Sequence, residues 1–218
     1  MKVGVDGVLL GAWTNTGEAK TILDIGTGTG LLSLMLAQKC EAKIHAIEVD
    51  SNSFQQANIN FQQSLWINRI TSEQISFQDF CLKNNSVFDL IVCNPPYFEK
   101  SLKSADTSRN TARHNDTLPL HDLFDGVSKQ LSEIGRFVLI YPFQQLDSLN
   151  VQALGKKLYA INEFIVSGTG KKEPNRVLVE YSRQKKDCSS NRLIIRDHLN
   201  NDYTEAYKEL TKDYYLAF

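Results

Sequence analysis

The sequence contains no run of about 18 consecutive apolar residues, which is the length that a helix needs to cross a membrane. Its start, MKVGVDGVLL, carries Lys2 as its one basic residue before an apolar run that Gly and Asp interrupt, unlike a secretory signal. Glycine and proline are also scarce, at 12 and 5 of 218 residues, which excludes collagen-like and low-complexity chains. We therefore expect an ordinary globular protein that is cytoplasmic and not bound to a membrane. A monomer is a separate expectation.

Cysteine is sparse and scattered along the chain. None of the four cysteines forms a C-x-x-C pair, and none has a histidine nearby at the spacing of metal ligands. The pattern therefore indicates reduced structural thiols and no metal site. The four positions are Cys40, Cys81, Cys93 and Cys188.

An excess of charge of either sign is absent as well. The formal net charge is -1 and the sequence pI is about 6.4, so the chain has no general attraction to nucleic acid. If the protein binds RNA, the binding must come from local basic patches.

Short β-rich apolar runs alternate with segments of helical periodicity along most of the chain. This rhythm predicts an α/β fold with an open, mostly parallel sheet. A length of 218 residues without internal repeats suits one domain, residues 1–218. The predicted strands are 21–25, 43–49, 74–79, 88–94, 135–142, 159–167 and 176–182, and the predicted helices are 31–39, 51–66, 120–132 and 144–157.

Two connections stand out among the predicted elements. Only the loop Gly168–Asn175 separates the last two strands, and a connection this short joins antiparallel neighbours. The sheet should therefore end in an antiparallel strand. The stretch Phe98–Thr117 has no regular pattern, and loops of that length in compact domains are commonly functional.

A glycine-rich turn, LDIGTGTG over residues 23–30, ends one predicted strand and opens the next helix. Gly26, Gly28 and Gly30 stand where the backbone must turn tightly and approach a ligand. The spacing differs from the dinucleotide fingerprint G-x-G-x-x-G, and Asp24 precedes the first glycine by two positions. That carboxylate would repel a pyrophosphate but attract a cationic aminoacyl-sulfonium ligand. An ordinary strand-to-helix turn is the alternative interpretation.

Two further acidic residues follow predicted strands. Glu48 closes the second strand, where its side chain can accept hydrogen bonds from both hydroxyls of a ribose. Asp79 follows the third predicted strand and could accept a hydrogen bond from an adenine amine, with Phe80 packing nearby. A solvated turn is the alternative for Asp79.

The tetrad Asn94-Pro95-Pro96-Tyr97 directly follows the apolar strand FDLIVC, at the sheet edge where α/β proteins bind ligands. An amide oxygen and a proline carbonyl can both accept hydrogen bonds from a planar NH2 group, and the Tyr97 ring offers a face for a base to stack on. Accepting both N–H bonds aims the amine lone pair at a methyl donor. This arrangement predicts methyl transfer to an amine without a general base.

These motifs together resemble the amino methyltransferases of class I, and KVGVDGVLLGAW with NPPYF is similar to the bacterial tRNA-Val (adenine-37) N6-methyltransferases. The resemblance extends over almost the whole chain, including ARH at 112–114 and the ending DYTEAYKELTKDYYLAF. It implies a Rossmann-like fold with a seven-stranded sheet, S-adenosylmethionine as cofactor and a tRNA as substrate. By position it implies a catalytic loop at Asn94, Pro95, Pro96 and Tyr97, and cofactor contacts at Gly4, Asp6, Asp24, Gly26, Thr27, Gly28, Gly30, Glu48, Val49, Asp79 and Phe80.

The segments that flank the predicted site carry further expectations. Residues 1–20 would border the cofactor, and residues 98–117 would form a loop that faces the RNA. That loop has an excess of basic residues that suits phosphate contacts: Lys100, Lys103, Arg109, Arg113 and His114. A second basic group flanks the terminal hairpin, with a solvated surface as the equal alternative: Lys171, Lys172, Arg176, Arg183, Lys185 and Lys186.

Other functions remain open on the sequence alone. An NPPY loop also suits the side-chain amide of a protein glutamine, and the amines of ribosomal RNA or of small molecules fit the same chemistry. A non-catalytic RNA-binding protein with the same fold is a further alternative, which the intact Asp24, Glu48 and NPPY positions disfavour. A dehydrogenase is disfavoured by the glycine spacing.

Overall fold

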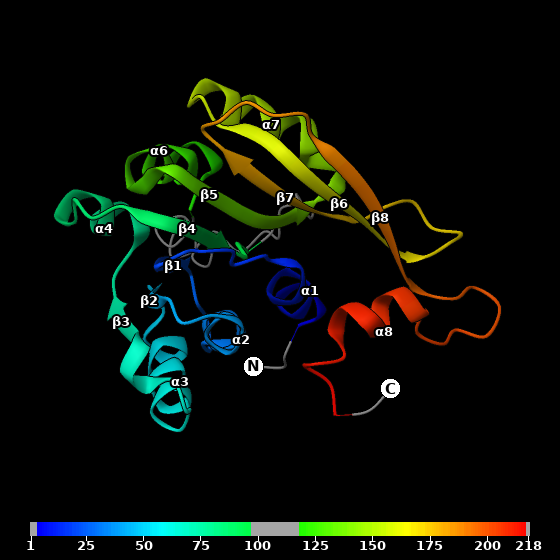
Figure 1. The fold of residues 1–218 in the computed structure, drawn as a ribbon, viewed down its shortest axis with the longest axis horizontal. Coiled ribbons are helices and arrows are strands. Elements are labelled where there is room, and N and C mark those ends of the chain that lie inside the picture. Colours follow the sequence, from blue (N-terminus) through cyan, green and yellow to red (C-terminus); the bar gives the residue numbers. More distant parts are fainter. Residues whose placement is uncertain (1–3, 97–117, 217–218) are drawn as a thin grey trace, which may run out of the picture.

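The computed structural model describes residues 4–96 and 118–216, and the strands in these ranges form one eight-stranded sheet. The strand order is β3-β2-β1-β4-β5-β7-β6-β8, and only β7 runs antiparallel to its neighbours (Figure 1). The strands are β1 (Thr21–Ile25), β2 (Lys43–Glu48), β3 (Ile70–Gln74), β4 (Phe88–Cys93), β5 (Leu131–Pro142), β6 (Tyr159–Thr169), β7 (Arg176–Ser182) and β8 (Ser189–Arg196).

Helices cover both faces of the sheet. Figure 1 shows α4, α6 and α7 on one side and α1, α2, α3 and α8 on the other. None of the helices in the described part of the chain is long and apolar enough to cross a membrane. Their bounds are α1 (Val5–Trp13), α2 (Leu31–Lys39), α3 (Ser51–Gln62), α4 (Phe77–Lys83), α6 (Leu120–Gln130), α7 (Leu146–Gly155) and α8 (Glu205–Thr211).

Alternation along the central strands divides the hydrophobic core in two. In β4, Leu90 and Val92 point toward the core under α1 and α2, whereas Ile91 and Cys93 point toward the core under α4, α6 and α7. All four side chains are buried, because a parallel strand between two helical layers has no solvent-facing side. This explains why FDLIVC is a nearly continuous apolar run.

Most of the predicted elements are confirmed, including β1, α2 and β7 with their predicted bounds. The parallel arrangement of β1, β2, β4 and β5 and the antiparallel β6–β7 hairpin are also as predicted. The helix predicted over residues 51–66 ends earlier, at Gln62, and β5 begins four residues before the predicted strand.

The third predicted strand is wrong. The strand lies at residues 70–74, and the residues from Phe77 onward form α4 instead. Ser76 caps this helix, since its hydroxyl accepts from the Asp79 backbone N–H at 3.0 Å and donates to the Asp79 carboxylate at 2.8 Å. The tetrapeptide Ser-Phe-Gln-Asp is therefore a helix start signal of the capping-box kind rather than the end of a strand.

The strand count and the end of the sheet also differ from the prediction. An eighth strand, β8, pairs in parallel with β6 at the edge, so the antiparallel strand β7 lies inside the sheet and not at its end. The sequence of β8, SSNRLIIR, is mostly polar and exposed, which is why it lacks the apolar signature of the other strands. The helices α1 and α8 were not predicted either.

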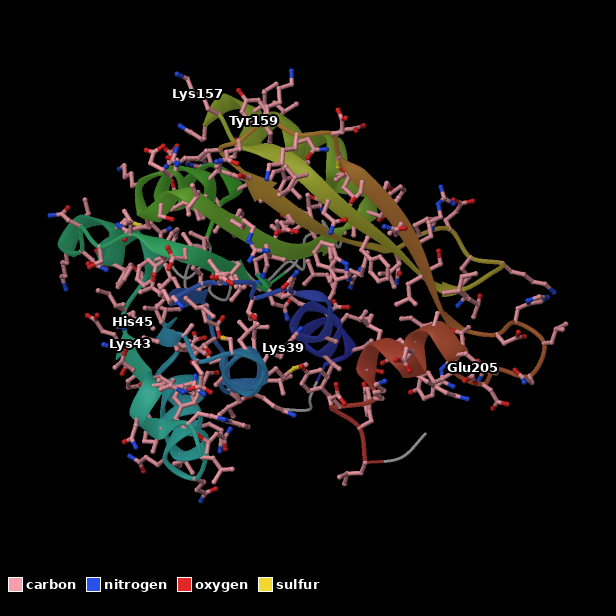
Figure 2. All side chains as sticks on the ribbon, viewed as in Figure 1. Lys39, Lys43, His45, Lys157, Tyr159 and Glu205 are labelled. Atoms are coloured by element: carbon pink, nitrogen blue, oxygen red, sulfur yellow. The ribbon has the colours of Figure 1, made fainter. Side chains whose placement is uncertain are left out.

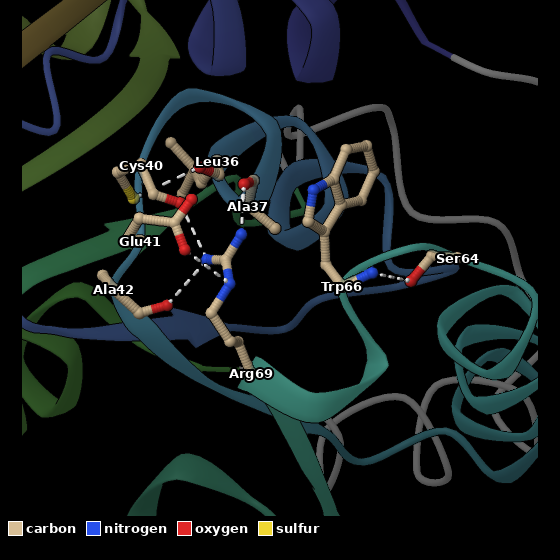
Figure 3. A network of polar contacts seen from close by, with 8 residues as sticks. All are labelled: Leu36, Ala37, Cys40, Glu41, Ala42, Ser64, Trp66 and Arg69. Atoms are coloured by element: carbon tan, nitrogen blue, oxygen red, sulfur yellow. Dashed lines mark hydrogen bonds and ion pairs between the residues drawn. The ribbon is translucent and has the colours of Figure 1, made fainter.

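Polar contacts to backbone carbonyls fix the end of α2. The guanidinium of Arg69 donates to the carbonyl oxygens of Ala37, Cys40 and Ala42 at 2.9, 2.7 and 3.1 Å (Figure 3). It also pairs with the exposed carboxylate of Glu41 at 3.3 Å. Because the last carbonyls of a helix have no partner within it, a cation placed there stabilises the helix end and its connection to β2.

The chain order reverses between β1 and β4. From β1 the chain proceeds outward through β2 and β3 on one side, and from β4 it proceeds to β5 on the other. In open α/β sheets ligands bind at such a point, beyond the carboxyl ends of the strands. Asp24, Glu48 and Asn94 all lie at this edge.

Candidate active site

A cavity of about 670 Å³ opens at this edge of the sheet, within the size range of small-molecule sites. It is lined by the N-terminal end of α1, the glycine-rich loop after β1, the end of β2, the start of α4 and the residues after β4. The residues that line it are Gly4, Val5, Asp6, Gly7, Asp24, Ile25, Gly26, Thr27, Gly28, Thr29, Leu31, Leu32, Ile47, Glu48, Val49, Ser53, Ile75, Ser76, Phe77, Gln78, Cys93, Asn94, Pro95, Pro96 and Leu118.

Asp24 is a buried carboxylate at the floor of the cavity. The residue is only 1% exposed to solvent. Its Oδ2 accepts hydrogen bonds from the Thr27 hydroxyl at 2.6 Å and the Ser33 hydroxyl at 2.7 Å. The pKa of Asp24 is raised to about 6, chiefly by burial and to a smaller extent by the nearby Glu48, and the hydrogen bonds from Thr27 and Ser33 oppose the rise. A cation in the cavity would favour the ionised form of this group.

Glu48 is held by backbone N–H groups. Its Oε2 accepts from Gly28 at 2.8 Å, and its Oε1 accepts from Val49 and Asp50 at 2.9 Å each. Since each carboxylate oxygen has two lone pairs, three of the four are occupied, and one on Oε2 remains for a hydroxyl donor of a ligand. The bond to Gly28 also ties the glycine-rich loop to the end of β2.

The glycine-rich loop is fixed at several points. The Thr27 N–H donates to the Ile47 carbonyl at 3.0 Å, and the Asn60 amide of α3 donates to the Thr29 carbonyl at 2.8 Å. Gly30 has φ = 86°, and a Cβ atom there would lie 2.5 Å from the Phe61 ring. Only glycine combines that backbone angle with such close packing. The loop is therefore held in one conformation by its surroundings.

Asn94 and the two prolines close the opposite side of the cavity. Asn94 is half-buried, Pro95 is buried and Pro96 is exposed. The helix α1 lies close above Asn94, because a Cβ atom on Gly7 would approach the Asn94 Nδ2 to 3.7 Å and the Leu31 Cδ2 to 3.3 Å. A side chain at position 7 would therefore crowd Leu31 and come into van der Waals contact with the Asn94 amide.

Most of the predicted cofactor contacts are brought together at this cavity: Gly4, Asp6, Asp24, Gly26, Thr27, Gly28, Glu48 and Val49. Three are not among the lining residues. Gly30 packs against Phe61, and Asp79 is exposed and accepts a hydrogen bond from the Ser76 hydroxyl. Phe80 is buried in the core, where its ring stacks on His45 with 5.3 Å between the ring centroids. The positions of Asp79 and Phe80 follow from α4, which replaces the predicted strand.

The predicted RNA contacts divide into two groups. Tyr97 and the residues Lys100, Lys103, Arg109, Arg113 and His114 lie outside the described residues. The second basic group is split between opposite ends of β7, since this strand runs from the cavity edge to the far edge of the sheet. Lys171, Lys172 and Arg176 lie near its start, and Arg183, Lys185 and Lys186 follow its end.

Two members of that second group have internal partners. The Arg183 guanidinium donates to the carbonyl oxygens of Ser128 and Leu131. The Arg176 Nε donates to the Asp6 carboxylate at 2.9 Å. Both arginines thus have structural contacts, which the sequence pattern alone did not indicate.

Sequence reasoning missed the wall formed by Ile75, Ser76, Phe77 and Gln78. The capping signal at Ser76 could have located it, because a helix that begins after a parallel strand presents its first turn to the ligand edge.

Cys93 also lines the cavity, and burial raises the pKa of its thiol, so the group stays protonated and unreactive. In residues 4–96 and 118–216, no cluster of three or more metal-ligating side chains is present.

The conformation at Gly30 gives a direct test of the loop. We expect Gly30→Ala to lower the free energy of unfolding by about 2 to 4 kcal/mol, from a strained φ and overpacking against Phe61. Gly155→Ala is the matched control, because Gly155 is exposed at the end of α7 and a Cβ atom there meets nothing within 4 Å. Urea denaturation measures both, and equal stabilities of the two variants would contradict the proposed constraint.

Comparisons with known proteins agree with this geometry. The family described as methyltransferase small domain matches residues 6–141. The chain is 44% identical over 220 residues to the tRNA1(Val) (adenine(37)-N6)-methyltransferase of Bacteroides fragilis, covering 99% of this chain and 91% of that one. The protein of the same name from Haemophilus influenzae is 40% identical over 220 residues, covering 100% of this chain and 93% of the relative.

Solved structures show the same fold at low sequence identity. A predicted O-methyltransferase from Agrobacterium tumefaciens superposes with a TM-score of 0.75 and 16% identity, covering 95% of this chain and 96% of that one. A glycopeptide N-methyltransferase in complex with S-adenosylmethionine superposes with a TM-score of 0.61 and 14% identity, covering 82% and 95% of the two chains. The chain belongs to the methyltransferase small domain family and, within it, to the family of the tRNA1(Val) (adenine(37)-N6)-methyltransferases.

Proposed function

We propose that the protein transfers the methyl group of S-adenosylmethionine to the N6 amine of adenine in a tRNA, at position 37 next to the anticodon of tRNA-Val. One observation carries the proposal: Asn94 and two prolines border a cavity that also contains Asp24 and Glu48. The identity of 40–44% over nearly the whole chain to relatives named for this reaction supports the choice of substrate.

The lining of the cavity fits the cofactor. S-adenosylmethionine supplies, when bound, an electrophilic methyl group on a positively charged sulfonium. The buried carboxylate of Asp24 favours a cationic group beside it, in a site where low polarity strengthens the attraction. Glu48 can accept a hydrogen bond from a ribose hydroxyl, and the apolar side chains of Ile47, Ile75 and Phe77 suit the flat face of a base.

Asn94 is the residue to which we assign the chemistry. Its amide oxygen and the Pro95 carbonyl would accept the two N–H bonds of the target amine. These bonds withdraw the nitrogen lone pair from the ring and point it at the methyl group, so positioning and electrostatics supply the rate gain. Tyr97 would stack on the unstacked base, and Lys100, Lys103, Arg109, Arg113 and His114 would contact RNA phosphates.

The central experiment uses labelled S-adenosylmethionine and total tRNA from a strain that lacks the cognate enzyme. After digestion, we expect N6-methyladenosine in the anticodon loop fragment of tRNA-Val. Asn94→Ala should lower the rate by about 10²- to 10³-fold, because an interaction with the reacting amine is lost. Asn191→Ala, at an exposed position of β8, should methylate at the wild-type rate.

Two results would contradict the proposal. The first is a protein that binds S-adenosylmethionine but leaves tRNA unmethylated and methylates a glutamine amide of a translation factor instead. The second is an Asn94→Ala variant as active as Asn191→Ala, which would remove Asn94 from the reaction.

The raised pKa of Asp24 predicts a pH dependence of cofactor binding. As the pH falls through about 6, free Asp24 takes up a proton, which a cationic ligand must then displace. We expect binding to be about tenfold weaker at pH 5 than at pH 7, with proton release near pH 6. Isothermal titration calorimetry in buffers of different ionisation enthalpy measures both quantities.

5′-Methylthioadenosine is the matched ligand control for this measurement, since it lacks the charged amino-acid part. Its affinity should not change across the same pH range. A pH-independent affinity for S-adenosylmethionine without proton release would argue against contact between Asp24 and the cationic end.

A further inference from the structure

The helix α1 forms one wall of the cavity but has little stability of its own. Its first turn and the preceding residue, Gly4 to Gly7, line the cavity. It has only nine residues, with two glycines inside it, and no side chain caps its start at Gly4. Helices this short are marginal in water, and each internal glycine weakens them further. Contacts with the rest of the protein must therefore hold α1 in place.

The C-terminal end of α1 is firmly held. Lys39, labelled in Figure 2, lies at the end of α2. Its ammonium group donates to the carbonyl oxygens of Gly11, Ala12 and Thr14 at 3.1, 2.8 and 2.6 Å. A cation at the end of a helix satisfies carbonyls that lack a partner in the helix. This contact lies at the end of α1 away from the cavity.

The N-terminal end of α1 is tied to a different element. Asp6 accepts a hydrogen bond from Arg176 Nε at 2.9 Å, and the two side chains are 28% and 27% exposed. Arg176 begins β7 and lies opposite Pro142, level with the carboxyl end of β5. The ion pair thus connects the cavity wall to a strand that is 170 positions away in the sequence.

Arg176 itself is not among the residues that line the cavity, and neither is any other residue of β7. Asp6 does line the cavity, and the next residue, Gly7, lies over Asn94. The ion pair with Asp6 gives Arg176 a route to the cavity through the position of α1.

We propose that Arg176 is a positioning residue that holds α1 against the cavity through Asp6 and thereby sets the affinity for S-adenosylmethionine. When only a fraction of the molecules has α1 in place, the apparent dissociation constant rises in inverse proportion to that fraction. The rate at saturating cofactor is unchanged, since cofactor binding itself restores the docked helix. The inference rests on the proposed cofactor site and not on the identity of the methyl acceptor.

The experiment measures binding of S-adenosylmethionine by calorimetry and steady-state methylation for Arg176→Gln. We expect the dissociation constant and the KM for the cofactor to rise about three- to tenfold, with kcat at saturating cofactor and tRNA unchanged. Arg176→Lys, which retains the charge, should recover part of the affinity. Arg192→Gln is the matched control, because Arg192 is an exposed arginine of β8, and its affinity should equal that of the wild type.

A double-mutant cycle and hydrogen exchange separate positioning from general destabilisation. Asp6→Asn with Arg176→Gln should bind no more weakly than Asp6→Asn alone, because the pair is already broken. Amide exchange should increase in α1 of Arg176→Gln while α6 and the central strands stay protected, and saturating S-adenosylmethionine should reverse the increase.

Several results would overturn the inference. One is a wild-type affinity for S-adenosylmethionine in Arg176→Gln, and another is an equal loss of that affinity in Arg192→Gln. A fall in kcat of Arg176→Gln at saturating cofactor would also contradict it. If Arg176→Gln raised only the KM for tRNA, Arg176 would be a phosphate contact instead. If the wild-type protein bound no S-adenosylmethionine at all, the proposed function would fail and the inference with it. Binding by the wild type with no change in the variant would overturn the inference only.

Discussion

The Asp24 carboxylate lies at the end of a central strand, shielded from water, with hydroxyl groups of Thr27 and Ser33 bonded to one of its oxygens. An ionised carboxylate in such surroundings is costly unless it is hydrogen-bonded or balanced by a positive charge. The two hydroxyls provide part of that balance and at the same time fix the turn that leads into α2. A cationic ligand would provide the rest, so the loop geometry and the preference for a cation share one physical cause.

The remainder of the site is arranged around this group by the sheet. Because β1, β2 and β4 are parallel neighbours, their carboxyl ends bring Asp24, Glu48 and Asn94 to one edge. Glu48 accepts a hydrogen bond from Gly28 of the glycine-rich loop. The helix α1 lies close to Asn94 at Gly7, which has no side chain to keep the two apart. The site is therefore assembled from short segments that contact one another.

The part of this site that follows from local sequence patterns was predictable. Glycine spacing, an acidic residue at the end of a strand and the Asn-Pro-Pro run each act within a few residues, and the alternation of strands and helices orders them correctly. The third strand was misassigned because QISFQD has an apolar pattern typical of strands, while the bond between Ser76 and Asp79 begins a helix there. As a result the wall at Phe77 and Gln78 was missed.

Other features lack any local signal. The edge strand β8 is polar, so its place in the sheet depends on pairing with β6 and not on its own pattern. The contact between Asp6 and Arg176 joins residues 170 positions apart, and a sequence shows only that two opposite charges exist. Such contacts result from the topology, which only the completed fold reveals.

A crystal structure of the protein with S-adenosylmethionine would test the central claim, that one cavity presents the methyl group to Asn94. We expect the amino-acid end of the cofactor beside Asp24 and α1, the ribose beside Glu48, and the sulfonium methyl group directed at Asn94. A cofactor bound in the reverse direction, with its adenine beside Asp24, or one bound outside this cavity, would contradict it.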